Sequence, residues 1–264
     1  MTKVLVLKKG VELIRSGLGV YLEHQETLVI ADLHIGLEFA LMGEGTYLPV
    51  LQYPVLEKSI LELVDEYKPT RLVINGDFKH EFARATNQEW TEILDLWDVL
   101  KNKNVELELV RGNHDNFLIN VLKQRGKTIS DPSLSLGEVL ITHGHKPFQI
   151  HDEIKTIILA HEHPAIAFKD DAGGKHKFKC YLYGKHYGRD VIILPAFSPM
   201  AAGVPVNSAK IHRFMSQWLE NIDTSGFEPI VVDSGEILTF PPLEKLELVE
   251  VYDPWLDKLE VSER

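Results

Sequence analysis

Five short clusters in the sequence combine carboxylate, amide and imidazole side chains, the groups that bind divalent metals. Each cluster directly follows an apolar run of strand-like composition. In chain order they are Asp32-Leu33-His34, Gly76-Asp77, Gly112-Asn113-His114-Asp115, Thr142-His143-Gly144-His145 and His161-Glu162-His163-Pro164. Mixed oxygen and nitrogen ligation without thiolate suits Mn²⁺, Fe or Zn²⁺. The set therefore indicates a metal site.

The spacing within two of the clusters indicates how ligands could share ions. Asp32 and His34 are two residues apart, and side chains two apart on an extended segment point to the same face, so both can address one ion. His161 and His163 have the same spacing and can diverge to two neighbouring ions.

Each cluster taken alone has a plainer interpretation. An Asp-x-His after a strand is usually a helix cap or a hydrogen-bonded turn. Gly-Asp is a common turn dipeptide, and Gly-Asn-His-Asp can be a loop with asparagine in the left-handed conformation. The two His-x-His clusters can be surface features. All five in this order, each behind its own apolar run, favour a functional site.

The elements that must position these clusters alternate between strand-like and helix-like patterns. Apolar runs predict buried strands, and apolar residues at helical spacing predict amphipathic helices. The predicted strands are residues 27–31, 71–75, 105–110 and 139–142, and the predicted helices are residues 55–67, 88–100 and 117–125.

The last third of the sequence is rich in strand patterns separated by turn signals. The predicted strands are residues 165–168, 177–183, 191–195, 230–232 and 236–240. Alternating β and α elements followed by β-rich sequence predict stacked sheets flanked by helices, in a single domain over residues 1–264.

The composition places the chain among globular proteins. Of its 264 residues 44% are hydrophobic and 25% charged, a typical balance. The net charge of -11 argues against a whole-surface grip on nucleic acid. No stretch approaches the ~20 apolar residues of a membrane span, and the N-terminus lacks a signal-peptide pattern. One cysteine, Cys180, excludes an intrachain disulfide and favours a cytoplasmic, reducing location.

The ordered set of clusters resembles the calcineurin-like metallophosphoesterase superfamily, over residues 32–163. Gly76-Asp-Phe-Lys-His80 and His161-Glu-His-Pro164 are further similar to the Icc-related phosphoesterases of archaea and bacteria, some of which accompany a DNA ligase and helicase. The resemblance implies an α/β fold, a four-layer α/β/β/α sandwich of two stacked mixed sheets flanked by helices. Ala160 stands where the superfamily usually has glycine, and alanine fits there if its φ is negative.

The resemblance also implies two divalent metal ions. Mn²⁺ is favoured, and Fe, Zn²⁺ or Ni²⁺ would also fit. Two divalent cations, two carboxylates and a bridging hydroxide carry a net positive charge, which suits an anionic phosphate. The implied ligands are Asp32, His34 and His163 for one ion, Asn113, His143 and His161 for the other, and Asp77 as the bridge between them.

Catalytic roles follow from the same resemblance. His114 would protonate the leaving alkoxide or hold a phosphate oxygen, and Asp115 would orient His114. Four neighbouring side chains are expected either to touch phosphate or to support the ligands: Lys79, His80, His145 and Glu162.

The expected reaction is hydrolysis of a phosphate ester by metal-bound hydroxide. A phosphodiester is preferred, because an alkoxide leaving group gains most from an acid such as His114. A phosphomonoesterase, a nuclease and a catalytically retired scaffold remain alternatives, although no implied ligand is missing. The expected partner is a small phosphate ester or short nucleotide. Nucleic acid is less favoured, no membrane partner is expected, and the oligomeric state stays open.

Two further segments allow two interpretations each. Basic and aromatic residues are interleaved over residues 169–189 and could grip single-stranded nucleic acid. One face of the segment, Lys177, Lys179, Tyr181 and Tyr183, alternates with Phe178, Cys180 and Leu182, which favours an amphipathic strand with one solvated face. Residues 194–203, rich in small side chains, either line the pocket or simply connect strands.

Overall fold

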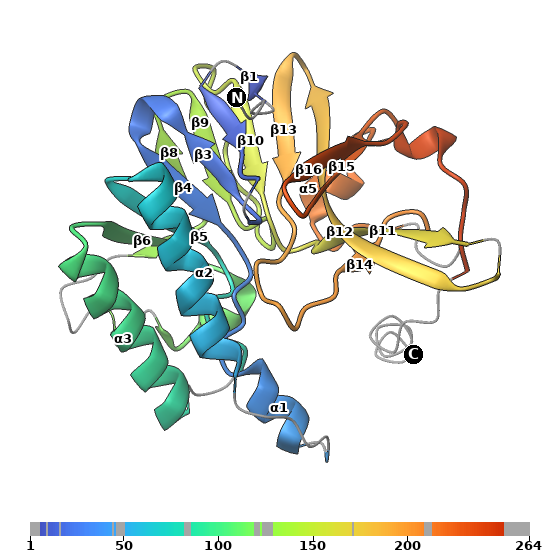
Figure 1. Cartoon of the computed structure of the whole chain (residues 1–264). Helices are drawn as coiled ribbons and strands as arrows, with labels where there is room; N and C mark the ends of the chain where they lie inside the picture. Colours follow the sequence, from blue (N-terminus) through green and yellow to red (C-terminus); the bar gives the residue numbers. More distant parts are fainter. Residues whose placement is uncertain are drawn as a thin grey trace.

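Two β-sheets lie against each other with helices on the outside (Figure 1). The computed structural model describes residues 6–8, 10–15, 17–43, 45, 51–81, 86–118, 122, 129–170, 172–208 and 213–250. The first sheet has the strand order β1 (Val6–Lys8), β2 (Val11–Leu13), β3 (Val20–Leu22), β4 (Thr27–Ile30), β5 (Arg71–Asn75), β6 (Glu106–Val110) and β7 (Ile129–Ser130). Strands β4 to β7 are parallel, and β1 to β4 are antiparallel neighbours.

The second sheet is also mixed. Its order is β14 (Val204–Pro205), β11 (Pro164–Lys169), β12 (Lys175–His186), β13 (Arg189–Ile193), β10 (Thr156–Leu159), β9 (Val139–Thr142) and β8 (Ser133–Leu136), with β15 (Glu228–Asp233) paired to β12 and β16 (Glu236–Thr239) paired to β15. Strands β9, β10 and β13 are parallel. Within each sheet the parallel central strands therefore end at one edge, where sites are usually built.

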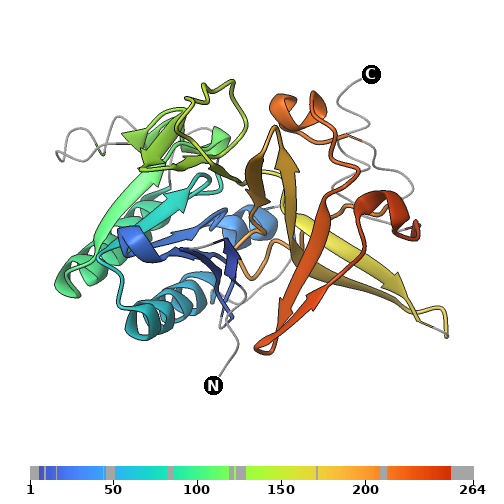
Figure 2. The ribbon, with the colours of Figure 1, turned by 90° about the horizontal axis from the view of Figure 1, so that it is seen from above.

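Alternation along β4 shows how the layers form. Leu28 and Ile30 face the cluster that includes helices α2 (Gln52–Tyr67) and α3 (Asn87–Asn102). Val29 faces the opposite way, into a core shared with the second sheet. Successive side chains of a strand point to opposite faces, so one apolar run supplies both layers. Figure 2, seen from above, shows α2 and α3 on one flank of the two sheets.

The outer face of the second sheet has a thinner cover. Helix α5 (Gln217–Glu220) and connecting segments pack there, with Leu219 and Phe227 against Leu159 and Leu182. The predicted α/β class with two mixed sheets and flanking helices is confirmed. Among the described residues, none of the helices has the length and apolar composition that a membrane span requires.

Most predicted elements occur with small changes at their ends. The predicted strand at residues 71–75 has the same bounds in β5, whereas α2 starts three residues before the prediction. The short antiparallel strands β1 to β3 and helix α1 (Leu37–Gly43) were not predicted. The helix predicted at residues 117–125 lies mostly outside the described residues.

Candidate metal centre

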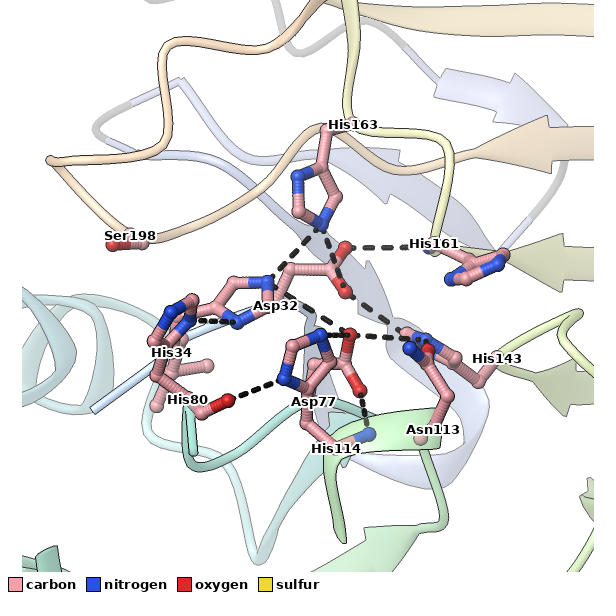
Figure 3. Close-up of polar contacts among 12 residues, drawn as sticks. Asp32, His34, Asp77, His80, Asn113, His114, His143, His161, His163 and Ser198 are labelled. Atoms are coloured by element: carbon pink, nitrogen blue, oxygen red, sulfur yellow. Dashed lines mark hydrogen bonds and ion pairs between the residues drawn. The ribbon is translucent and has the colours of Figure 1, made fainter. Parts of the chain in front are cut away.

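The five clusters lie at the carboxyl ends of five strands. They follow β4, β5 and β6 of the first sheet and β9 and β10 of the second. Within each sheet these strands are parallel neighbours, so their ends meet at one edge. Figure 3 shows the side chains converging there from both sheets.

Two groups of the converging atoms share one carboxylate. Within each group, one candidate ligand atom per residue lies within 4.8 Å of the others. We call them the Asp32 group, which is Asp32, His34, Asp77 and His163, and the His143 group, which is Asp77, His143 and His161. A third such group, His34, His80 and His114, shares His34 with the Asp32 group. The amide oxygen of Asn113 lies 3.2 Å from Nε2 of His143. All seven residues that the sequence indicates as ligands are thus together.

The backbone at these ligands differs from the sequence-based expectation. Five of the seven take a positive φ, from 45° at His163 to 75° at His161. The others are Asp32, His34 and Asp77. The expectation of an extended segment, with side chains two apart on one face, is therefore wrong. Left-handed backbone at non-glycine residues costs about 1–3 kcal/mol each and persists only where its surroundings impose it.

Glycine permits the close approach of neighbouring loops. Gly76 has a φ of 83°, and a Cβ there would clash with the ring of His143. A Cβ on Gly112 would clash with the carboxylate of Asp77. Ala160, in contrast, is absent from the residues with positive φ, so alanine is tolerated at that position.

Charge is concentrated around Asp77. Burial by itself would raise the pKa of Asp77, but His143, His34 and His114 outweigh burial and hold that pKa well below its usual value. Burial likewise opposes the charged form of His143, yet the carboxylates of Asp77 and Asp32 raise its pKa to about 10. Oppositely charged groups are thus gathered out of water.

The donor set fits a bound cation. Oδ1 of Asp32 is buried and has no hydrogen-bond partner among the described residues. Nε2 of His34 lies 3.3 Å from Nε2 of His163, so two imidazole nitrogens face each other. Burial, followed by His143, lowers the pKa of His161 to about 3, which keeps this imidazole neutral, the form that binds metal.

His114 lies beside both groups. Its backbone N–H donates to Oδ1 of Asp77 at 3.0 Å, and its Nε2 lies 3.8 Å from Oδ2 of Asp77. Its Nδ1 lies against the carbonyl oxygen of His80. The His80 carbonyl therefore orients this ring, with Nε2 toward the shared carboxylate.

Asp115 joins two loops by hydrogen bonds to backbone. Its carboxylate accepts from the N–H of Phe78 at 3.1 Å and from that of Gly112 at 2.9 Å. Burial, followed by Asp77, raises the pKa of Asp115 to about 6. This residue fastens the turn carrying Asp77 to the turn carrying Asn113.

Three of the four neighbouring candidates occupy different places around the centre. Lys79 is fully buried, and its ammonium group donates to the carbonyl oxygen of Glu81. Nδ1 of His80 lies 3.4 Å from Nδ1 of His34. The ring of His145 lies 5.2 Å from that of His143, and its Nδ1 is buried without a partner in the described part of the chain.

Two lysines of the basic and aromatic segment hold the loop at residues 194–203. Lys179 donates to the carbonyl oxygens of Ala196 and Ser198, and Lys177 donates to that of Gly203 at 2.9 Å. Burial lowers the pKa of Lys179 to about 8. The segment is a strand as predicted, but its lysine face is not solvated as predicted, because Tyr181 on the same face is fully buried.

Sequence reasoning missed Gln52. Its amide nitrogen donates to the carbonyl oxygens of Leu33 and His34 and to Oγ of Ser198. The backbone N–H of Ser198 in turn donates to the carbonyl oxygen of Asp32 at 3.1 Å. Gln52 precedes the helix predicted at residues 55–67, and no local pattern distinguishes it from a surface glutamine.

Glu162 lies between two ligands and supports them. It is 5% exposed, and its oxygens accept from the backbone N–H groups of Met215 at 2.9 Å and Ser216 at 2.7 Å. Burial raises its pKa to about 7. The carboxylate thus ties the His161–His163 turn to the segment that precedes α5.

Comparisons with known proteins agree with this geometry. The profile of the calcineurin-like phosphoesterase family matches residues 26–214. A comparison with curated protein sequences finds no match. The solved structure of the Pseudomonas putida nuclease MPE is similar with a TM-score of 0.61 and 19% identity, over 87% of this chain and 94% of that one. The solved structure of a phosphoesterase from E. coli has a TM-score of 0.38 and 16% identity, over 82% of this chain and 98% of that one. The first likeness shows a shared fold.

Proposed function

This chain belongs to the calcineurin-like phosphoesterase family and is a hydrolase of phosphate esters, and we propose that it is a phosphodiesterase that uses two divalent metal ions. The observation that carries the proposal is the pair of ligand groups that share Asp77. A shared carboxylate is what holds two ions close together in two-metal hydrolases.

The proposed ligands divide between two ions. When bound, the ions would lower the pKa of a water molecule, orient the phosphate and stabilise the charge that develops in the displacement. The first ion would be held by Asp32, His34 and His163, the second by Asn113, His143 and His161, and Asp77 would contact both.

We assign proton donation to His114. Because the His80 carbonyl accepts the proton of Nδ1, Nε2, on the side of Asp77, is the nitrogen that can gain or lose a proton. Burial lowers the pKa of this ring, although Asp77 opposes the shift. When protonated, Nε2 would pass its proton to an alkoxide as the ester bond breaks. Asp115 would act indirectly, by holding the backbone of Gly112, two residues before His114, to that of Phe78, next to Asp77.

We propose Mn²⁺ as the metal and the cytoplasm as the location. The donor set contains carboxylate, amide and imidazole groups without thiolate, which suits Mn²⁺ and also Fe, Zn²⁺ or Ni²⁺. Cys180 is fully buried, and burial raises the pKa of its thiol, so it is no metal ligand. A free cysteine agrees with a reducing compartment.

The alternatives differ in substrate or in activity. A phosphomonoesterase would use the same centre. A nuclease is favoured by the fold shared with the Pseudomonas putida nuclease and disfavoured by the net charge of -11. A retired scaffold is disfavoured by the complete set of seven ligands.

One screen tests these choices. Chelator-stripped protein is reloaded with Mn²⁺, Fe²⁺, Zn²⁺, Ni²⁺ or Mg²⁺ and assayed on a nitrophenyl diester, a nitrophenyl monoester, cyclic nucleotides and short oligonucleotides. We expect the diester to be hydrolysed with the highest kcat/KM and Mn²⁺ to be the best metal. A higher kcat/KM for the monoester would make the protein a phosphomonoesterase, and inactivity with every metal would support the scaffold.

A further inference from the structure

Three charged side chains form a cluster beside the candidate metal centre. Nη1 of Arg111 donates to Oδ2 of Asp131 at 2.6 Å, and Nζ of Lys146 lies 3.0 Å from both oxygens of that carboxylate. Two cations thus share one anion, so the cluster keeps a positive charge within an acidic protein. The side chains are 21–35% exposed, and an anion from solvent can reach them.

The cluster borders the His143 group rather than the Asp32 group. Arg111 contacts the side-chain oxygen of Asn116, whose amide donates to the carbonyl oxygen of Asn113 at 3.2 Å. Lys146 directly follows His145, whose ring lies 5.2 Å from that of the ligand His143. Both cations are therefore attached to the loops that carry ligands of the second ion.

A pocket of about 450 Å³ adjoins the segments that carry the cluster. Pro132 and Pro147, the chain neighbours of Asp131 and Lys146, both line it. Its remaining lining combines hydroxyl, amide, imidazole and aromatic groups: Ser133, Ser135, Leu140, Phe148, Gln149 and His151. The cationic cluster is thus joined through Pro132 and Pro147 to a pocket that includes Phe148.

We propose that Arg111 and Lys146 form a subsite for a second phosphate, one nucleoside away from the phosphate that is hydrolysed. This inference rests on the proposed phosphodiesterase function and names its substrate class, a nucleotide chain with at least two phosphates. Guanidinium and ammonium groups bind phosphate oxygens by charge-assisted hydrogen bonds. The pocket with Phe148 would receive the base, since aromatic rings stack on any base.

Asp131 gives the cluster its second property. Its carboxylate holds both cations in place without substrate, but it also repels an incoming phosphate. Removal of its charge should therefore strengthen binding of the second phosphate, whereas removal of either cation should weaken it. A cluster that merely stabilised the fold would show no such opposite signs.

The test compares three dinucleotides on the Mn²⁺-loaded full-length protein. Thymidylyl-thymidine (dTpdT) has one phosphate, and pdTpdT and dTpdTp each carry one more at opposite ends. We expect kcat/KM for one of the two longer substrates to exceed that for dTpdT by roughly tenfold, about the worth of one charge-assisted hydrogen bond.

Variants separate the subsite from the metal centre. We define the preference as kcat/KM for the better two-phosphate substrate divided by kcat/KM for dTpdT. Lys146→Gln should lower this ratio to about one, and Asp131→Asn should raise it above the wild-type ratio. The matched control is Lys155→Gln, because Lys155 also pairs with a carboxylate, Glu138, but at the opposite ends of β9 and β10. The control should keep the wild-type preference. Lys146 is 35% exposed, so its variant tests the subsite even if Asp131→Asn fails to fold.

Two results would overturn the subsite: equal kcat/KM for all three dinucleotides, or a preference that survives in Lys146→Gln. Failure of the proposed function looks different, because the wild type would then hydrolyse neither bis-para-nitrophenyl phosphate nor dTpdT. In that event calorimetric binding of pdTpdT and dTpdTp decides. Tighter binding of one of them to the wild type than to Lys146→Gln supports the subsite, and equal binding of both overturns it.

Discussion

The two turns that carry paired ligands, residues 32–34 and residues 161–163, share a conformation but are held in different ways. In both turns, the two ligands have a positive φ and one residue separates them. One turn follows β4 of the first sheet and the other follows β10 of the second. Each must maintain a backbone that an isolated chain would avoid.

The turn at residues 32–34 is held mainly by backbone of the neighbouring loop. The N–H of Asp32 donates to the carbonyl oxygen of Gly76 at 3.1 Å, and the N–H of His34 donates to the backbone carbonyl oxygen of Asp77 at 2.9 Å. Gln52 adds its side-chain amide. These bonds continue the pairing of β4 with β5 beyond the strand ends.

The turn at residues 161–163 depends more on one side chain. The carbonyl oxygen of His163 accepts from Val204 at 2.7 Å, while Glu162 places a buried carboxylate on the N–H groups of Met215 and Ser216. Strained backbone at candidate ligands is thus imposed by strand-like pairing in one turn and by a single buried carboxyl group in the other. The support from Glu162 is the easier one to remove by mutation, because it depends on one side chain.

The largest expected effect comes from Asp77, the residue common to the Asp32 group and the His143 group. Asp77→Asn should reduce metal content from about two ions per chain to less than one. Activity should fall on the order of 10⁴-fold or more, because a metal is what lowers the pKa of water from about 15.7 to near 7. Elemental analysis and Mn²⁺-dependent kinetics measure both, with Asp223→Asn, an exposed aspartate, as the control. Retention of both ions would contradict the shared-ligand assignment.

The next effect separates chemistry from metal binding at His114. His114→Ala should keep metal content near two while kcat falls by roughly 10²–10⁴-fold, the usual worth of a general acid. Hydrolysis of a nitrophenyl ester should suffer less than that of an alkyl ester, because nitrophenolate needs little protonation. Equal losses for both would make His114 a phosphate-positioning residue. Because His114 also lies close to His34 and His80, loss of metal would make it a ligand.

Glu162 tests the turn held by a single charge. Glu162→Ala leaves two buried N–H groups without acceptors, and we expect affinity for both ions to fall by about 10–100-fold, as for other residues that support ligands. Both ions are affected because His163 belongs to the Asp32 group and His161 to the His143 group. Glu162→Gln keeps one acceptor oxygen, so its metal affinity should lie between that of the wild type and that of Glu162→Ala. Calorimetric Mn²⁺ titration measures this, with Glu236→Ala as the surface control.

The smallest effect is expected at Gln52. Gln52→Ala removes hydrogen bonds to backbone carbonyl oxygens, including that of His34. The His34 carbonyl oxygen keeps a second donor, the N–H of Leu37 at 3.1 Å. Carbonyl oxygens tolerate the loss of one partner better than N–H groups do. The same titration should show that Mn²⁺ affinity falls by no more than about threefold, and for one of the two ions only. If Gln52→Ala matched Glu162→Ala, the contrast between the two turns would be refuted.

The sequence by itself determined the central parallel strands of the first sheet and which side chains gather at their ends. Runs such as residues 27–31 and 71–75 must be buried, and parallel strands end at one edge, so the residues after them meet. The sequence could not indicate β1 to β3, because three-residue strands carry too little pattern. The sequence also led to the wrong prediction that the lysine face of β12 is solvated. Alternation shows that a strand has two different faces, but it does not show what packs against each face.

Only the tertiary structure decided how the ligands are aimed and supported. The left-handed backbone at Asp32 and His161, the link from Gln52 to Ser198 and the anchoring of Glu162 on Ser216 leave no local pattern. The physical reason is distance along the chain. Gln52 and Ser198 are 146 residues apart, and Glu162 and Ser216 are 54 apart. Such contacts exist only after both sheets have packed, and they then impose a backbone that local preference opposes.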